Sequence, residues 1–136
     1  MNAPTPVPTR SVESDAQSLM AQCRGRRWNL LQHYARLEIA LKHRLENPPM
    51  TFGAKVRAWI KIDPAAKCFE RLINARNLAA HALVSPVRID GTPYAQWEVA
   101  DGVSELNCAK FDKSALKVWA DDLDALLKQA ITAATA

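Results

Sequence analysis

The stretch from Asp63 to Val84 constrains the fold of this chain more than any other segment. It begins with Asp63 and Pro64, an N-cap residue followed by the proline favoured in the first helical turn, and it stops before Ser85 and Pro86. Between these signals, apolar residues recur at three- and four-residue spacing: Phe69, Leu72, Ile73, Ala80, Leu83 and Val84. The pattern predicts one amphipathic helix over 63–84, with these residues in the core.

Polar residues interrupt and flank the apolar face of this helix. At about 100° per residue, Arg76 projects into the middle of the apolar stripe. A polar ladder at i, i+4, i+7 and i+11 runs beside it, formed by Glu70, Asn74, Asn77 and His81. We expect the ladder to line an interface or to contact a substrate, since core packing alone does not need these residues.

The remaining helical patterns predict a single, mainly α-helical domain in a chain of 136 residues. We expect a disordered, proline-rich leader over 1–12, because it has almost no apolar residues, followed by one domain over 13–136. Three further helices are expected at 14–45, 51–62 and 112–136. Gly25 is a weak point in the first, and the alanine-rich end of the last, 130–136, should fray.

A change of pattern predicts a small β-strand insertion at about 86–111, before the last helix. Its expected parts are a hairpin of 87–89 and 94–99 around the turn residues 90–93, a second turn at 101–102, and a third strand at 105–111.

The long first helix also carries charged residues, Arg27 and Glu38, on its apolar stripe. An unpaired charge facing a core costs on the order of several kcal/mol. Glu38 and Arg76 have opposite signs, so one interpretation is that the two helices pack together and these side chains pair. The other is that each side chain extends to solvent along a buried stem.

The net charge and the cysteine content limit the ligands, metals and cellular locations to be expected, but they do not identify the function. The net charge is +4, and residues 1–90 hold 14 of the 18 Lys and Arg, which fits either phosphate binding or dimer pairing. Cys23, Cys68 and Cys108 have no metal-ligand spacing, so we expect free buried thiols, no metal and no cofactor. With no apolar run long enough for a membrane span and no signal-peptide pattern, we expect a cytoplasmic protein.

Other basic residues leave two interpretations open. His81 is either a structural residue near a helix C-terminus or a functional imidazole that Asn77, one turn earlier, orients. Arg24, Arg26 and Arg27 form a cluster beside Trp28 that fits an RNA contact or a solvated helix surface. His33 and His43 lie off the apolar stripe and are expected to be solvated.

The segment Arg76-Asn77-Leu78-Ala79-Ala80-His81 resembles the signature of the HEPN superfamily, an arginine followed after four to six residues by a histidine. The helical order around it also resembles that family over about 14–84 and 112–130. This resemblance implies an antiparallel HEPN-like helical bundle that forms a homodimer. It also implies a metal-independent endoribonuclease with a composite active site at the dimer interface, cutting RNA to leave a cyclic phosphate.

By the same resemblance, His81 would be the acid/base, Arg76 would stabilise the phosphate, and Asn77 would orient either group. The stripe argument adds Glu38 as the carboxylate that holds Arg76. The implied setting is defence, stress or a toxin–antitoxin system, which allows an antitoxin or regulatory protein as a further partner. Leu83 stands where one branch of the family carries a tyrosine that a nucleotidyltransferase modifies, so that regulation is not expected here. The alternatives are a non-catalytic dimeric interaction module and a passive RNA-binding protein.

Overall fold

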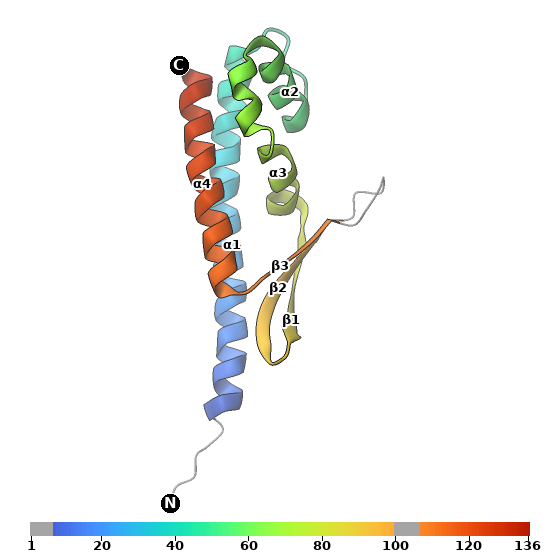
Figure 1. Ribbon diagram of the computed structural model, residues 1–136, viewed down its shortest axis with the longest axis vertical. Helices are drawn as coiled ribbons and strands as arrows, with labels where there is room; N and C mark the ends of the chain where they lie inside the picture. The colour runs from blue at the N-terminus through green and yellow to red at the C-terminus, as the bar shows by residue number, and fades with distance from the viewer. Residues whose placement is uncertain (1–6, 100–106) are drawn as a thin grey trace, which may run out of the picture.

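Two long helices, α1 (Val7–Arg44) and α4 (Lys113–Thr135), lie side by side along the computed structural model, which describes residues 7–99 and 107–136 (Figure 1). They run parallel, because Arg26 near the start of the contact pairs with Asp121 while Arg44 reaches the carbonyl of Ala134. The expected antiparallel bundle is therefore wrong for this pair. The reason is that the intervening segments return the chain to the lower end before α4 begins.

The first helix begins earlier than the sequence pattern predicted. α1 starts at Val7 rather than at 14, so residues 7–12 of the expected disordered leader are helical, while residues 1–6 lie outside the described residues. Pro8 is tolerated because it stands in the first turn, where an amide has no helical partner. Gly25 lies inside the continuous helix. Of the nine apolar residues that form the predicted stripe of this helix, Met20 and Leu31 are half-buried, and the other seven are buried: Leu19, Cys23, Leu30, Tyr34, Leu37, Leu41 and Leu45.

The stretch predicted as one helix over 63–84 is divided into three parts. A 3-10 helix, η1 (Pro64–Phe69), is followed by a turn, by α3 (Leu72–His81) and by the start of a strand at Leu83. The break lets Phe69 stack on Trp59 of α2 (Phe52–Ile62), with ring centroids 5.4 Å apart, while Leu72 is fully buried beside α1. Tertiary packing thus overrides the local helical pattern.

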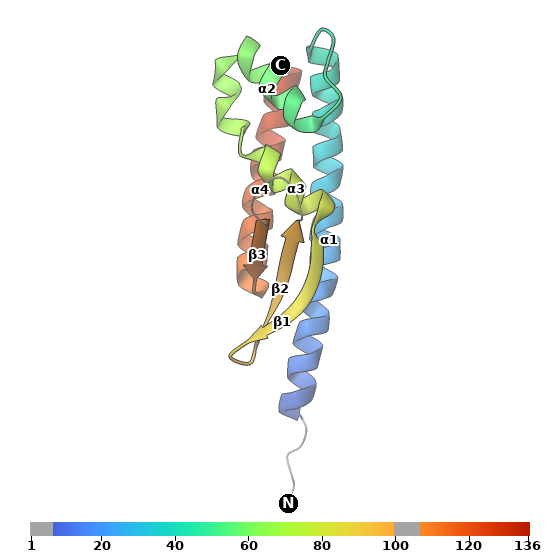
Figure 2. The same cartoon turned by 90° about the vertical axis from the view of Figure 1, so that its right-hand side faces the viewer.

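The predicted strands form one antiparallel sheet in the order β1 (Leu83–Ile89), β2 (Thr92–Val99) and β3 (Asn107–Phe111) (Figure 2). Leu83 and Val84, expected on the helix, pair with Glu98 and Trp97 of β2. The hairpin prediction is confirmed, but its turn is tighter than expected, because Asp90 and Gly91 both adopt positive φ, at 51° and 79°. The predicted second turn at 101–102, and residues 105–106 of the third strand, lie outside the described residues.

One face of the sheet packs on the two long helices. Ala95, Trp97 and Val99 form a cluster with Leu19 and Cys23 of α1 and with Leu116 of α4. A second, larger cluster lies toward the other end of the molecule, where α1 and α4 pack against α2, η1 and α3. The sheet and the three shorter helical segments therefore share the two long helices as a common support.

Capping residues define the helix ends. Thr51 caps α2 and Asp112 caps α4, each accepting a hydrogen bond from an amide three residues on, at 3.2 and 2.8 Å. The expected fraying of 130–136 is wrong, since α4 continues to Thr135. Ala130 and Ala134 are buried in the main cluster, and Arg44 donates to the carbonyls of Ala134 and Ala136.

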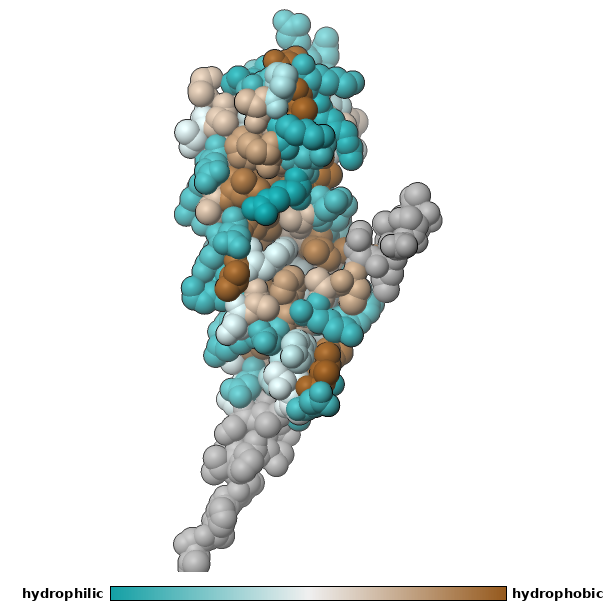
Figure 3. All heavy atoms as spheres, in the orientation of Figure 1, coloured by the Kyte–Doolittle hydropathy of each residue, from teal (hydrophilic) through white to brown (hydrophobic). Residues whose placement is uncertain are grey.

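The described chain is thus mainly helical with a small three-stranded sheet, as predicted. The face shown in Figure 3 is largely hydrophilic, with its apolar residues in separate patches. Within the described ranges, no helix combines the length and the apolar content that crossing a bilayer requires.

Candidate functional site

The two opposite charges that the sequence places on facing helices do meet. Arg76 Nη2 of α3 lies 4.0 Å from Glu38 Oε1 of α1, with 31% and 30% of the two side chains exposed. The guanidinium carbon of Arg76 also lies 5.7 Å from the ring centroid of Phe52. The predicted pairing is confirmed, and it leaves part of the Arg76 side chain exposed to solvent.

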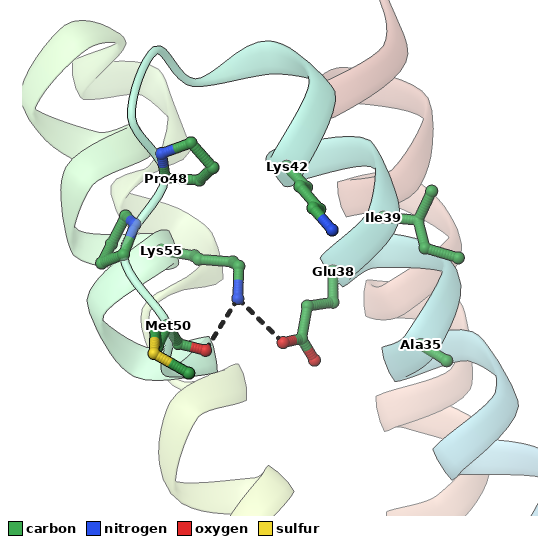
Figure 4. Close-up of a pocket in the computed structure, with 8 residues that line it drawn as sticks. Ala35, Glu38, Ile39, Lys42, Pro48, Met50 and Lys55 are labelled. Carbon is green, nitrogen blue, oxygen red and sulfur yellow. Dashed lines mark hydrogen bonds and ion pairs between the residues drawn. The ribbon is translucent and has the colours of Figure 1, made fainter.

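A lysine that the sequence analysis missed is the closer partner of Glu38. Lys55 Nζ of α2 donates to Glu38 Oε2 and to the carbonyl oxygen of Met50, both at 2.9 Å, and only 8% of its side chain is exposed. Figure 4 shows Lys55 and Glu38 pointing toward one another from opposite walls. The argument that found Arg76 could have found Lys55, since it lies three residues after Phe52 and beside Val56 on the apolar stripe of α2.

The ion pair of Glu38 and Lys55 spans an open groove of about 490 Å³ between α1 and the loop before α2 (Figure 4). Most of its lining is aliphatic, and the lining residues are Ala35, Glu38, Ile39, Lys42, Pro48, Pro49, Met50 and Lys55. Three cations, Lys42, Lys55 and Arg76, lie around the single carboxylate of Glu38 in or beside the groove. The local charge is therefore positive.

The imidazole of His81 lies apart from this cluster. His81 is exposed in the last turn of α3. His81 lies five positions after Arg76 on α3, which corresponds to about 140° around the helix axis and about 7.5 Å along it. Within the described residues, no hydrogen bond or ion pair joins the two side chains. One copy of the chain therefore does not assemble Arg76 and His81 into a single site.

The rest of the polar ladder lies at the surface. Glu70 precedes α3, in the turn after η1, and pairs with Lys67 at 3.0 Å, so the ladder does not lie on one continuous helix. Asn74 is exposed and Asn77 is half-buried. Within the described part of the chain, the hydrogen bonds include none between Asn77 and His81.

The arginines of the basic cluster on α1, at positions 24, 26 and 27, do not form one surface, because Arg26 and Arg27 have different partners. Arg27 donates to the carbonyl oxygens of Ala79 and Ala80 at 3.0 and 3.4 Å, and its guanidinium lies 5.6 Å from the ring centroid of Trp97. It therefore satisfies carbonyls at the end of α3, which explains its position on the buried stripe. Arg26 instead pairs with Asp121 at 2.8 Å.

Two expectations about side-chain exposure need correction. His33 is not simply solvated, because its Nε2 lies 2.8 Å from Asp124 Oδ1 of α4 and only 17% of its side chain is exposed. His43 is exposed, as expected. All three cysteines are free, but Cys23 alone is buried, whereas Cys68 and Cys108 are exposed.

Burial also perturbs one tyrosine in the core beside the cluster. Desolvation raises the pKa of Tyr34 well above its ordinary value, and the positive charge of Arg76 opposes this shift only partly. The hydroxyl donates to the carbonyl oxygen of Leu72 at 2.9 Å, so Tyr34 fixes the start of α3 against α1. The element that carries Arg76 is thus held at both ends, by Tyr34 and by Arg27.

Comparison of the chain with protein-family models, with curated proteins and with solved structures finds no match. Among the described residues, no group of three or more His, Cys, Asp or Glu side chains is placed to hold a metal ion. What the arrangement can do chemically follows from its own geometry: a positioned guanidinium and an exposed imidazole lie on one short helix, beside a cationic groove.

Proposed function

We propose that this protein is a metal-independent endoribonuclease of HEPN type, whose active site is completed by a second copy of the chain. The observation that carries the proposal is the placement of Arg76 and His81 on α3. Arg76 is held by Glu38 and Phe52 with part of its side chain exposed, and His81 is solvent-accessible five positions later. Because the two side chains point in different directions within one copy, the His81 and Arg76 that act together would come from different copies.

The proposed reaction uses the 2′-hydroxyl of RNA as the nucleophile. His81 removes the hydroxyl proton, the oxygen attacks the adjacent phosphorus, and the bond to the 5′-oxygen breaks. That oxygen takes up a proton, which leaves a 2′,3′-cyclic phosphate and a 5′-hydroxyl. Arg76 supplies positive charge and directional donors to the pentacoordinate phosphorane. Glu38 acts as a positioning residue for Arg76, and Asn77 is close enough along the helix to orient His81 or the phosphate.

The test is RNA cleavage in excess chelator by the wild type, His81→Ala and Arg76→Ala, each confirmed to be folded. His43→Ala and Arg57→Ala are matched controls, since both replace exposed residues of the same type elsewhere. We expect the site variants to lose at least about 100-fold in rate, as removal of an acid/base or of a charge-stabilising group does. The controls should cleave like the wild type, and the products should carry cyclic-phosphate ends.

The absence of cleavage by every variant, across several classes of RNA, would favour a non-catalytic dimeric interaction module instead. Equal cleavage by wild type and site variants would remove Arg76 and His81 from the site. Arg76→Lys separates charge from geometry, because an ammonium keeps the charge but lacks the planar pair of donors.

A further inference from the structure

Helix α1 exposes a second apolar stripe beside its buried one. Trp28 is 65% exposed and Ile39 58% exposed, and the small residue Ala35 lies exposed between them. Their spacing of seven and four residues places all three on one helical face. Met50, 92% exposed, borders the same face from the loop before α2. Two large exposed apolar residues on one helical face, with exposed Met50 beside them, mark this face as a candidate interaction surface.

We propose that a second copy of this chain covers this stripe, with the two α1 helices packed antiparallel about a two-fold axis near Ala35. A two-fold interface must be self-complementary, because the same surface is presented by both copies. In this arrangement a residue n positions before Ala35 faces the residue n positions after it in the other copy. A small residue at the centre lets the two helices approach closely.

The residues on this face match that requirement. Seven positions from Ala35, Trp28 faces Lys42, which pairs an aromatic ring with an ammonium. Four positions away, half-buried Leu31 faces Ile39. Each contact occurs twice, once on either side of the axis.

Charge complementarity extends the match beyond the apolar stripe. Eleven positions from Ala35, exposed Arg24 faces exposed Glu46 just beyond the end of the helix. Opposite charges at symmetric distances from one centre favour the antiparallel register about Ala35 over a parallel one, in which each residue would face its own copy.

The groove supplies a place for the exposed indole. In the proposed register, Trp28 of one copy lies over the groove of the other, between Ile39 and Lys42 on α1 and Pro48 and Met50 on the loop (Figure 4). The groove has a volume of about 490 Å³ and largely aliphatic walls. A tryptophan seated in an apolar pocket is the usual centre of a strong protein–protein contact.

The arrangement also bears on the proposed active site. Glu38 lies three residues from Ala35, less than one helical turn from the axis, so each Glu38 and the Arg76 that it holds lie near the second copy. This link to cleavage rests on the proposed endoribonuclease function. The interface itself rests on the α1 surface and on the groove beside it.

The test is the molar mass of the full chain in solution, measured by sedimentation over a range of concentrations. The wild type should be a dimer. Ala35→Glu should be a folded monomer, because it places two like charges together at the axis, whereas Ala125→Glu, at an exposed position of α4, should remain a dimer. Trp28→Ala should raise the dissociation constant by at least about 30-fold, the loss typical of a central tryptophan, while Val118→Ala should leave it unchanged.

Cross-linking tests the register itself, without a destabilising substitution. With Cys68 and Cys108 replaced by serine, Ala35→Cys should form a disulfide-linked dimer on mild oxidation, and Ala125→Cys should not. A monomeric wild type, or a dimer that Ala35→Glu leaves intact and Ala35→Cys does not cross-link, would overturn the proposal. A dimer that behaves as expected but cleaves no RNA would support the interface and count against the nuclease. A folded Ala35→Glu monomer with full cleavage would refute the composite site alone.

Discussion

Glu38 of α1 accepts a hydrogen bond of 2.9 Å from Lys55 of α2, although the lysine side chain is only 8% exposed. The same carboxylate lies 4.0 Å from Arg76 of α3. One acidic side chain thus joins three helices that the sequence separates, and it compensates a nearly buried ammonium. Its removal should therefore affect stability as well as the position of Arg76.

We expect Glu38→Ala to lower the free energy of unfolding by about 1–3 kcal/mol, because Lys55 then stays buried without its charged partner. The double variant Glu38→Ala/Lys55→Met should be more stable than Glu38→Ala alone, since an apolar side chain of similar length needs no partner. Urea unfolding followed by tryptophan fluorescence measures both. Glu70→Ala, which breaks an exposed pair, should change stability by less than about 0.5 kcal/mol. Strictly additive effects at Glu38 and Lys55 would show that the pair is not coupled.

Arg27→Met should destabilise the protein by about 1–2 kcal/mol, because carbonyl oxygens at the end of α3 lose their charged donor. Amide hydrogen exchange should accelerate near Ala79 and Ala80. Arg24→Met is the matched control, since Arg24 is exposed one helical turn earlier. Similar exchange in both variants would contradict the capping role of Arg27.

Tyr34→Phe should cost about 1–2 kcal/mol of unfolding free energy, because the carbonyl of Leu72 loses the buried hydroxyl that donates to it at 2.9 Å. Thermal unfolding followed by circular dichroism provides the measurement. Tyr94→Phe, at a half-buried position of β2, serves as the comparison. An equal or smaller loss for Tyr34→Phe would mean that this hydrogen bond contributes little.

Thiol labelling should divide the cysteines by exposure. Cys68 and Cys108 should react with a maleimide in the folded protein, whereas Cys23 should react only on unfolding. Burial raises the pKa of the Cys23 thiol, and the positive charges of Arg27 and Arg24 oppose that shift. Rapid reaction of all three cysteines with the maleimide in the folded protein would contradict the burial of Cys23.

The same shift predicts a pH dependence of stability. A raised pKa in the folded state means that the unfolded thiol ionises first, so stability is retained below the ordinary thiol pKa and falls as the pH rises above it. Cys23→Ala should reduce this decline. The measurement is the urea concentration at the midpoint of unfolding, for the wild type and Cys23→Ala, at about pH 8 and about pH 10. These two pH values lie on either side of the ordinary thiol pKa. An unchanged decline in Cys23→Ala would assign it to other groups.

The sequence by itself determined the elements with strong local signals. The α1 stripe and the hairpin around Asp90 and Gly91 each depend on residues close together in the chain. The pairing of Glu38 with Arg76 was also predictable, because an unpaired charge on an apolar stripe is costly enough to require a partner.

Only the tertiary structure decided where the chain departs from the secondary structure that its local sequence pattern predicts. The helical pattern over 63–84 breaks because Phe69 stacks on Trp59 and because Val84 pairs with Trp97, contacts that no local periodicity encodes. The parallel course of α1 and α4, the position of Lys55 beside Glu38, and the separation of His81 from Arg76 follow from the path of the chain between the helices. The physical reason is that helical periodicity determines which face of each segment is buried. Long-range packing determines which other segment that face contacts.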